Sequence, residues 1–193
     1  MRKDVKNRAS QCREEIDFAL AREADCGVLM NQLQEGILPL RVTHNDTKLN
    51  NILFDADTDQ GLCIIDLDTI MPGLAANDFG DSIRFGASTA EEDEPDLNKV
   101  HFDLYLYELY VKGYLEMARD VLTPAEIDSL PWGARLMTLE CGMRFLADYL
   151  QGDVYFKTAY PEHNLVRART QFRLVKEMEE QFERMYEILR KYS

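Results

Sequence analysis

The sequence predicts a mainly α-helical domain of the α+β kind, built as a helical bundle with one small β-hairpin near its start. Helical periodicity dominates on both sides of residues 41–68, whereas this segment alternates short β-rich runs with a polar turn. Hydrophobic residues are 46% and charged residues 30% of the 193, as in a folded globular protein. We therefore expect one domain over residues 1–193, with a single core.

Two helices are expected before the hairpin. Apolar residues at helical spacing predict the first over residues 10–24, with Ile16, Leu20 and Ala24 on one side. A second, shorter helix is expected to end at Gly36, and Pro39 prevents it from continuing.

Residues 41–68 are expected to form a loop followed by the hairpin. Arg41–Thr43 and Asn51–Phe54 are β-rich runs, and a polar turn over residues 55–61 separates them from Leu62-Cys-Ile-Ile-Asp66. Because this last run is apolar, we expect a buried returning strand, with Cys63 as a small core residue.

The chain after Asp68 is expected to be almost entirely helical. Thr123-Pro-Ala-Glu126 has the sequence of a capping box with proline at the first helical position, so one helix starts there. The acidic run Glu91–Glu94 is expected to be a solvated loop. The other predicted helices cover residues 78–86, 97–121, 132–150 and 164–192.

Charge and composition exclude several classes of partner. A net charge of −13 repels phosphate backbones and anionic lipids, so neither nucleic acid nor a membrane is an expected partner. No apolar stretch approaches the roughly 18–20 residues that cross a bilayer, and the N-terminus resembles no secretory signal. The four cysteines form no CxxC pair. These features favour a cytoplasmic protein with reduced thiols, in which a phosphate-handling site needs a metal ion or local cations.

A polar cluster in residues 41–68 carries the chemistry. His44, Asp46, Lys48 and Asn51 lie on the loop, and Asp66 and Asp68 follow the apolar strand. An acid at the end of a buried strand is costly to desolvate unless it binds a cation or a donor. The hairpin would bring the Asn51 and Asp66 ends together, and their oxygens are of the kind that Mg²⁺ takes beside substrate phosphates.

The pattern His-x-Asp-x-Lys-x-x-Asn, followed by an apolar strand that ends in Asp, resembles the catalytic loop and metal-binding strand of protein-kinase-like enzymes. It is more similar to the aminoglycoside phosphotransferase and choline kinase-like superfamily, and most similar within it to the N-acetylhexosamine 1-kinases. The resemblance covers roughly residues 10–190 and implies the C-terminal lobe of a protein-kinase-like fold. It is carried by residues 44–48, 65–69, 71–73, 78–81 and 144–149.

This resemblance implies a role for each residue of the loop. Asp46 would accept the proton of the acceptor hydroxyl, and Lys48 would offset the charge of the transferring phosphoryl group. His44 would anchor the loop. Asn51 and Asp66 would hold Mg²⁺ with ATP, and Asp68 would either ligate the metal or support its ligands. The implied cofactors are Mg²⁺ and ATP.

Asp78-Phe79-Gly80 spells the kinase metal motif, but no apolar strand leads into it. We therefore prefer Asp66 as the metal residue. Asp78 and Asp81 are expected either to cap the following helix or to brace the catalytic loop.

The expected acceptor contacts are Arg144, Asp148 and Tyr155, an unusual polar set beside an apolar helix face. In the N-acetylhexosamine kinases, positions matching Arg144 and Tyr155 contact the sugar, so the resemblance implies transfer to the anomeric hydroxyl of an N-acetylhexosamine. An aminoglycoside or amino alcohol is the alternative acceptor. Arg144 could equally serve in a structural ion pair.

Kinases of this type also need an N-terminal nucleotide lobe. No GxGxxG motif occurs in the sequence, and the chain before residue 41 is predicted to be helical. We therefore expect a C-terminal lobe that is inactive in isolation and able to dimerise through the face that the other lobe would cover.

Functions of other classes remain to be compared with this one. A non-catalytic binding module would share the fold. An iron-dependent oxygenase could use His44 and Asp46 with His101 or His163. A sulfate-ester hydrolase needs a Cys-x-Pro-x-Arg sequence, which none of the cysteines has.

Overall fold

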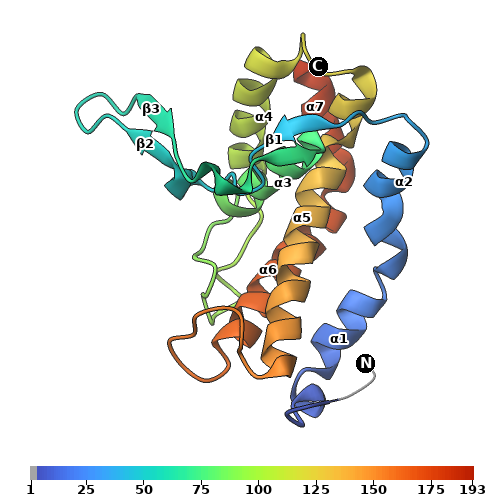
Figure 1. The fold of residues 1–193 in the computed structure, drawn as a ribbon, viewed down its shortest axis with the longest axis vertical. Coiled ribbons are helices and arrows are strands. Elements are labelled where there is room, and N and C mark those ends of the chain that lie inside the picture. Colours follow the sequence, from blue (N-terminus) through green and yellow to red (C-terminus); the bar gives the residue numbers. More distant parts are fainter. Residues whose placement is uncertain (1–3) are drawn as a thin grey trace.

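The fold is mainly helical in the computed structural model, which describes residues 4–193 (Figure 1). The helices are α1 (Arg13–Leu20), α2 (Val28–Gln34), α3 (Ala75–Gly86), α4 (Leu104–Ala118), α5 (Pro124–Gln151), α6 (His163–Glu180) and α7 (Phe182–Tyr192). The strands are β1 (Arg41–Thr43), β2 (Ile52–Phe54), β3 (Gly61–Ile64) and β4 (Met71–Gly73). The predicted fold class, a helical bundle with a small hairpin beside the catalytic loop, is confirmed.

The strands form two antiparallel pairs. β2 pairs with β3 as the predicted hairpin, with Ile52 opposite Ile64, and the hairpin projects from the helices (Figure 1). β1 pairs with β4, which the sequence did not predict, with Val42 opposite Pro72. The second pair closes the segment between β1 and β4 into a loop whose two ends lie side by side.

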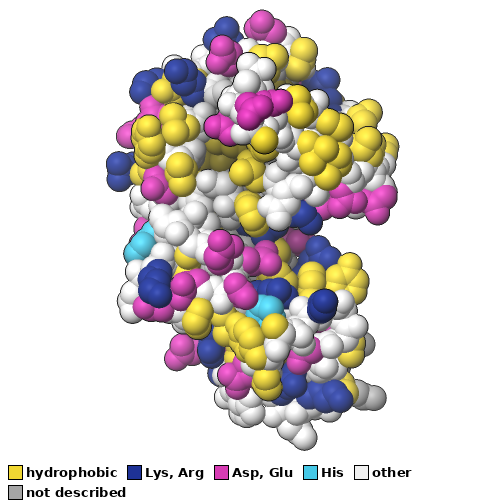
Figure 2. Space-filling model, turned by 90° about the vertical axis from the view of Figure 1, so that its left-hand side faces the viewer, with side chains coloured by type: hydrophobic (Ala, Val, Ile, Leu, Met, Phe, Trp, Pro, Cys, Tyr) yellow, Lys and Arg dark blue, Asp and Glu magenta, His cyan; other side chains and the backbone are white. Residues whose placement is uncertain are grey.

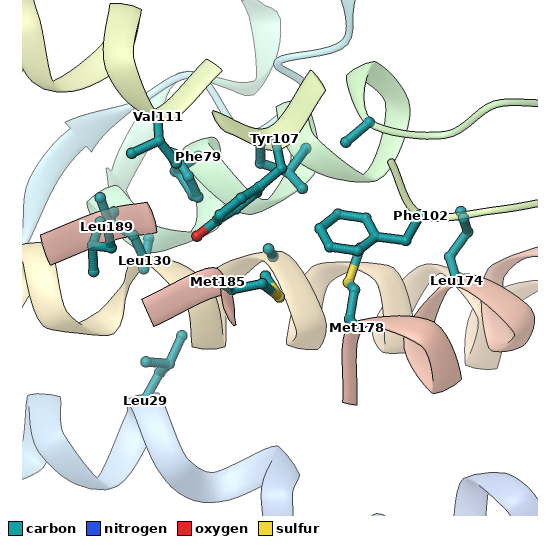
Figure 3. Close-up of a cluster of buried hydrophobic side chains, with 14 of the residues drawn as sticks. Leu29, Phe79, Phe102, Tyr107, Val111, Leu130, Leu174, Met178, Met185 and Leu189 are labelled. Carbon is teal, nitrogen blue, oxygen red and sulfur yellow. The ribbon is translucent and has the colours of Figure 1, made fainter. Parts of the chain in front are cut away.

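α5 runs through the centre of the molecule and packs against both α3 and α6 (Figure 1). Figure 3 shows the largest core cluster, in which aromatic and aliphatic side chains from α3, α4, α5 and the C-terminal helices converge. Phe79 of α3 meets Tyr107 of α4 edge-on, with ring centroids 6.2 Å apart. Each fully buried side chain of this size contributes about 1.5–3 kcal/mol. The core therefore fixes α3, the helix that reaches the catalytic loop.

The helices predicted from Thr123 and over residues 132–150 are a single helix, α5. Its capping box is as predicted: the Glu126 amide donates to Thr123 Oγ1 at 3.2 Å, and the Thr123 amide donates to Glu126 Oε2 at 2.8 Å. Pro131 lies inside the helix without ending it, because the fully buried Leu130 and Ala134 hold this turn against the core. Within residues 4–193, no helix is long and apolar enough to cross a membrane.

Two other helix boundaries differ from those predicted. The region predicted as one helix over residues 164–192 is divided at Gln181 into α6 and α7. α4 begins only at Leu104, because the Asp103 side chain caps it by accepting the amides of Tyr105 and Leu106. Ahead of this cap, the extended Phe102 forms a β-bridge with Ser88.

Three burial predictions were wrong. All residues of β3 are exposed, including Cys63, because the hairpin stands away from the helices. On α1 the buried side contains Cys12 and partly buried Ile16, whereas Leu20 is exposed because the helix ends there. The acidic loop is only partly solvated: Glu92 lies 2.8 Å from Arg84, whereas Glu91 is exposed as predicted.

Candidate active site

Two carboxylates of α3 hold the loop that follows β1. The backbone amides of His44 and Asn45 donate to Asp78 Oδ2 and Oδ1, both at 2.8 Å. The Thr47 amide donates to Asp81 Oδ2, also at 2.8 Å. Asp78 and Asp81 are three residues apart and so lie on one face of the helix. Of the two alternatives from the sequence, bracing of the catalytic loop is the one observed.

Asp46, Lys48 and Asn51 form a compact polar cluster on this loop. Asp46 Oδ2 lies 3.0 Å from Lys48 Nζ and accepts a hydrogen bond from Asn51 Nδ2 at 2.8 Å. Burial alone raises the pKa of Asp46, but the hydrogen bonds from Lys48 and Asn51 and the Lys48 charge outweigh it and lower the pKa below the usual range. Asp46 is therefore a carboxylate at neutral pH, able to accept a hydrogen bond from a hydroxyl.

His44 anchors the loop to the hairpin strand. Its Nε2 lies 3.0 Å from the Ile65 carbonyl oxygen, and its backbone carbonyl accepts a hydrogen bond from Thr69 Oγ1 at 2.6 Å. Among residues 4–193, its buried Nδ1 has no partner. With Nε2 donating to a carbonyl, the histidine orients the loop and its Nδ1 is the ring acceptor.

The backbone segments that carry Asn51 and Asp66 meet at the base of the hairpin, and Asp66 is not among the residues that line the cavity with Asn51. The Ile65 amide donates to the Asn51 carbonyl at 2.9 Å, which places Asp66 one residue from this contact. Asn51 is buried and uses its amide nitrogen on Asp46. Asp66 is exposed and has a left-handed backbone with φ 63°, unusual for a residue other than glycine. Asp68 is exposed on the 3-10 turn Leu67–Thr69.

A cavity of about 430 Å³ opens beside this cluster. Asp46, Lys48 and Asn51 line one side, and Tyr110 and Tyr114 of α4 line another. Tyr107 of the same helix is fully buried in the core, whereas Tyr110 and Tyr114 are partly buried and pack against that core while lining the cavity. Tyr110 and Tyr114 follow Tyr107 by three and seven residues, so all three lie on one face of α4, and each packs edge-on against Phe79.

Arg144, Tyr155 and Asp148 line a different cavity, of about 340 Å³, that shares no lining residue with the first. Arg144 Nη2 lies 3.4 Å from Tyr155 Oη. Asp148 is buried, and its oxygens accept hydrogen bonds from the amides of residues 154–156 and from Asn164 Nδ2, at 2.8–3.0 Å. This carboxylate holds the loop that carries Tyr155 and has little capacity left for a ligand.

Glu140 of α5 is an ion-pair neighbour of Arg144. Its carboxylate lies 3.7 Å from Arg144 Nε. Burial raises the pKa of Glu140, while the charges of Arg144 and Arg84 lower it and that of Asp81 raises it. Glu140 therefore lies within electrostatic range of both Arg144 and Asp81, the residue that holds the Thr47 amide.

The side chains needed for an iron-binding triad are not brought together. His101 Nδ1 contacts Glu177 at 3.0 Å, and His163 Nε2 contacts Asp93 at 3.0 Å. In the described part of the chain, no group of three His, Cys, Asp or Glu residues could hold a metal ion. The proposed pairing of His44 and Asp46 with either histidine is therefore wrong.

Comparison with known families gives one match. A family model described as "Phosphotransferase enzyme family" (APH) matches residues 1–117. This range is more than half of the chain and contains both strand pairs, the loop with Asp46 and the bracing helix α3.

Proposed function

This chain belongs to the phosphotransferase enzyme family, and from its catalytic loop we propose that it transfers the γ-phosphoryl group of ATP to a hydroxyl of a small molecule. The observation that carries the proposal is the Asp46–Lys48–Asn51 cluster, held by α3 and open to a cavity of about 430 Å³. Phosphoryl transfer depends mainly on positioning and charge neutralisation, and a braced loop provides the first of these.

Asp46 is the residue that orients the acceptor. Its lowered pKa keeps it ionised, so its free carboxylate oxygen can accept the hydroxyl hydrogen and point the oxygen towards the phosphorus. Lys48, 3.0 Å from Asp46 Oδ2, supplies positive charge next to the transferring group. His44 keeps the loop in register with the hairpin through Ile65.

Asn51 and Asp66 would hold a Mg²⁺ ion, which would supply positive charge beside the phosphates of ATP. The Asn51 amide nitrogen is occupied by Asp46, which leaves its oxygen to act as a ligand. The exposed Asp66 adds a carboxylate, and Asp68 lies two residues further along the chain. Mg²⁺ takes few protein oxygens beside phosphate and water, so this small oxygen set is sufficient. The bound ion would offset phosphate charge in a protein whose net charge is −13.

The nucleotide lobe lies outside this chain in our proposal. In the part that the structure describes, no strand precedes Arg41, so nothing there could form a sheet over the phosphates. The exposed side chains of the hairpin and of β1 offer an apolar surface for such a lobe. The 193 residues would then fold alone but turn over no ATP.

The proposal is tested by assaying transfer from ATP and Mg²⁺ with the chain joined to a nucleotide-binding lobe of the same family. Asp46→Asn should lower kcat by about 10²–10⁴ without unfolding the protein. Asp66→Asn should abolish the Mg²⁺-dependent rate. Asp57→Asn is the matched control: it removes an exposed carboxylate of the hairpin turn and should leave the transfer rate unchanged. Near-normal turnover by the Asp46 variant would refute the assignment.

For the acceptor we propose an N-acetylhexosamine phosphorylated at its anomeric hydroxyl, with an aminoglycoside or amino alcohol as the alternative. Support comes from Arg144 and Tyr155, which line one cavity and whose side chains lie 3.4 Å apart. A panel of N-acetylglucosamine, N-acetylgalactosamine, choline, homoserine and an aminoglycoside discriminates among these classes. Arg144→Ala should lower kcat/KM for the sugar, and an unchanged value would remove Arg144 from the acceptor site.

A further inference from the structure

A separate cavity of about 450 Å³ lies between the end of α3, the loop 87–103 and α6. Its lining includes Arg84, Glu91, Lys99 and Gln171, and it shares no residue with the cavity beside Asp46. Figure 2 shows acidic side chains gathered across the middle of the face from which the hairpin projects. The volume is in the range of small-molecule sites.

The walls of this cavity are held by polar contacts. The Thr89 amide donates to the His101 carbonyl at 3.1 Å, and Thr89 Oγ1 donates to the Lys99 carbonyl at 2.7 Å. Arg84 Nη1 donates to Glu92 Oε1 at 2.8 Å. The loop is thus fixed to itself and to α3, and the cavity is formed in advance of any ligand.

Gln171 supplies an unused hydrogen-bond acceptor in this cavity. Its residue is only 2% exposed, and among residues 4–193 its buried Oε1 has no partner. Buried polar atoms are nearly always paired in folded proteins, so an unpaired carbonyl oxygen on a residue that lines a cavity indicates a donor on a bound molecule or water. An N–H or O–H group is the only kind that satisfies it.

The charges of the lining residues indicate which kind of hydrogen-bond donor a ligand of this cavity would carry. Arg84 is neutralised by Asp81 and Glu92, and Lys99 lies 3.6 Å from Glu94. Glu91 is exposed and has no ion-pair partner in the part of the chain that the structure describes. The unbalanced charge is therefore a carboxylate. A metal ion is not indicated, because no suitable group of three ligands occurs within residues 4–193.

We propose that this cavity is a second ligand site, which binds a small hydrophilic molecule carrying a protonated amine. An N–H or O–H of the ligand donates to Gln171 Oε1, and Glu91 at the rim balances the ammonium charge. None of its lining residues belongs to the catalytic loop, and the nearest link to that loop is Arg84, which pairs with Asp81 at 3.0 Å.

The test uses the isolated chain and a matched pair of probes, 2-amino-1,3-propanediol and glycerol, which differ only by an ammonium in place of a hydroxyl. Amide and side-chain resonances are followed by ¹H–¹⁵N NMR during titration. The amine should cause saturable shifts of the Gln171 carboxamide and of the amides of residues 88–92, with at least about fivefold tighter binding than glycerol. Gln171→Met should weaken binding of the amine by about tenfold or more.

Glu91→Gln should abolish the preference for the amine, whereas Glu183→Gln, the same change of charge at an exposed position of α7, should leave it intact. Since Glu91 is exposed, this variant keeps the test valid even if the buried Gln171→Met variant fails to fold. Equal binding of the two probes, no saturable shift at Gln171, or shifts confined to the cavity beside Asp46 would each overturn the proposal.

Discussion

Gly80 of α3 packs so closely on Gly133 of α5 that a Cβ at Gly80 would lie 2.2 Å from the Gly133 carbonyl oxygen. The neighbouring turn of α3 carries Asp78 and Asp81, which hold the amides of the catalytic loop. The close crossing of α3 and α5 therefore fixes how far the carboxylates of Asp78 and Asp81 extend towards the catalytic loop. Because the clash would be with backbone, no side-chain rotation can relieve it.

Gly80→Ala should therefore destabilise the protein by about 1–3 kcal/mol, since α3 and α5 must separate to admit the methyl group. Urea unfolding followed by circular dichroism measures the effect. Gly113→Ala is the matched control, because a Cβ at this position of α4 meets nothing within 4 Å. It should be neutral or stabilising by up to about 1 kcal/mol. Equal stability of the Gly80 variant and wild type would contradict the tight crossing.

Asp78→Asn should loosen the catalytic loop without unfolding the domain. The two amides that donate to Asp78 at 2.8 Å lose a charged acceptor. Hydrogen exchange at His44 and Asn45 should accelerate by roughly tenfold or more, because these bonds protect the amides. Asp120→Asn, in the exposed turn that follows α4, should leave their exchange unchanged. Unaltered protection in the Asp78 variant would show that other contacts hold the loop.

The sequence predicted the loop and hairpin well because their signals are local. Spacing alone brought Asp46 and Asn51 onto one loop, and the capping box marked the start of α5 at Thr123. The pairing of β1 with β4 was not predicted, since a contact between distant residues leaves no local periodicity. The predicted burial of Cys63 was wrong for a related reason: an apolar strand is buried only where another element covers it.

The residues proposed to contact the acceptor illustrate the same limit. Polar character beside an apolar helix face identified Arg144, Asp148 and Tyr155 as a group, and they do line one cavity. Only coordinates show that Asp148 uses its oxygens on backbone amides of the following loop. The bracing role of Asp78 likewise became clear from distances, since its sequence context allowed a helix cap as well.

Asp148→Asn should free the loop that carries Tyr155. Burial raises the pKa of Asp148, but hydrogen bonds from Phe156, Tyr155, Val154 and Asn164 outweigh it and lower the pKa. Its contribution to stability is thus fully present above the unfolded pKa of about 4 and is lost as pH falls through the lower folded pKa. The variant should lose about 1.5–3 kcal/mol at pH 7.

Urea unfolding at several pH values checks this dependence. Between pH 7 and about pH 5 the difference between wild type and Asp148→Asn should stay constant, and below about pH 4 it should shrink. Asp120→Asn again serves as the exposed control. A difference that persists undiminished at pH 2 would mean that the carboxylate charge is not what holds the loop.

The apolar side chains of β1 and the hairpin should drive self-association of the chain. Val42, Leu62 and Ile64 are 83%, 65% and 58% exposed, and Figure 2 shows hydrophobic side chains gathered over the upper part of the face that includes the hairpin. Apolar patches of this kind are uncommon on monomers unless another surface covers them.

Leu62→Lys should therefore lower the association constant of the dimer, measured by sedimentation velocity, by at least about tenfold. Met117→Lys, at a still more exposed apolar residue of α4, is the control and should leave association unchanged. A chain that sediments as a monomer at about 100 μM would contradict a homodimer through the hairpin face, and equal loss in both variants would place the interface elsewhere.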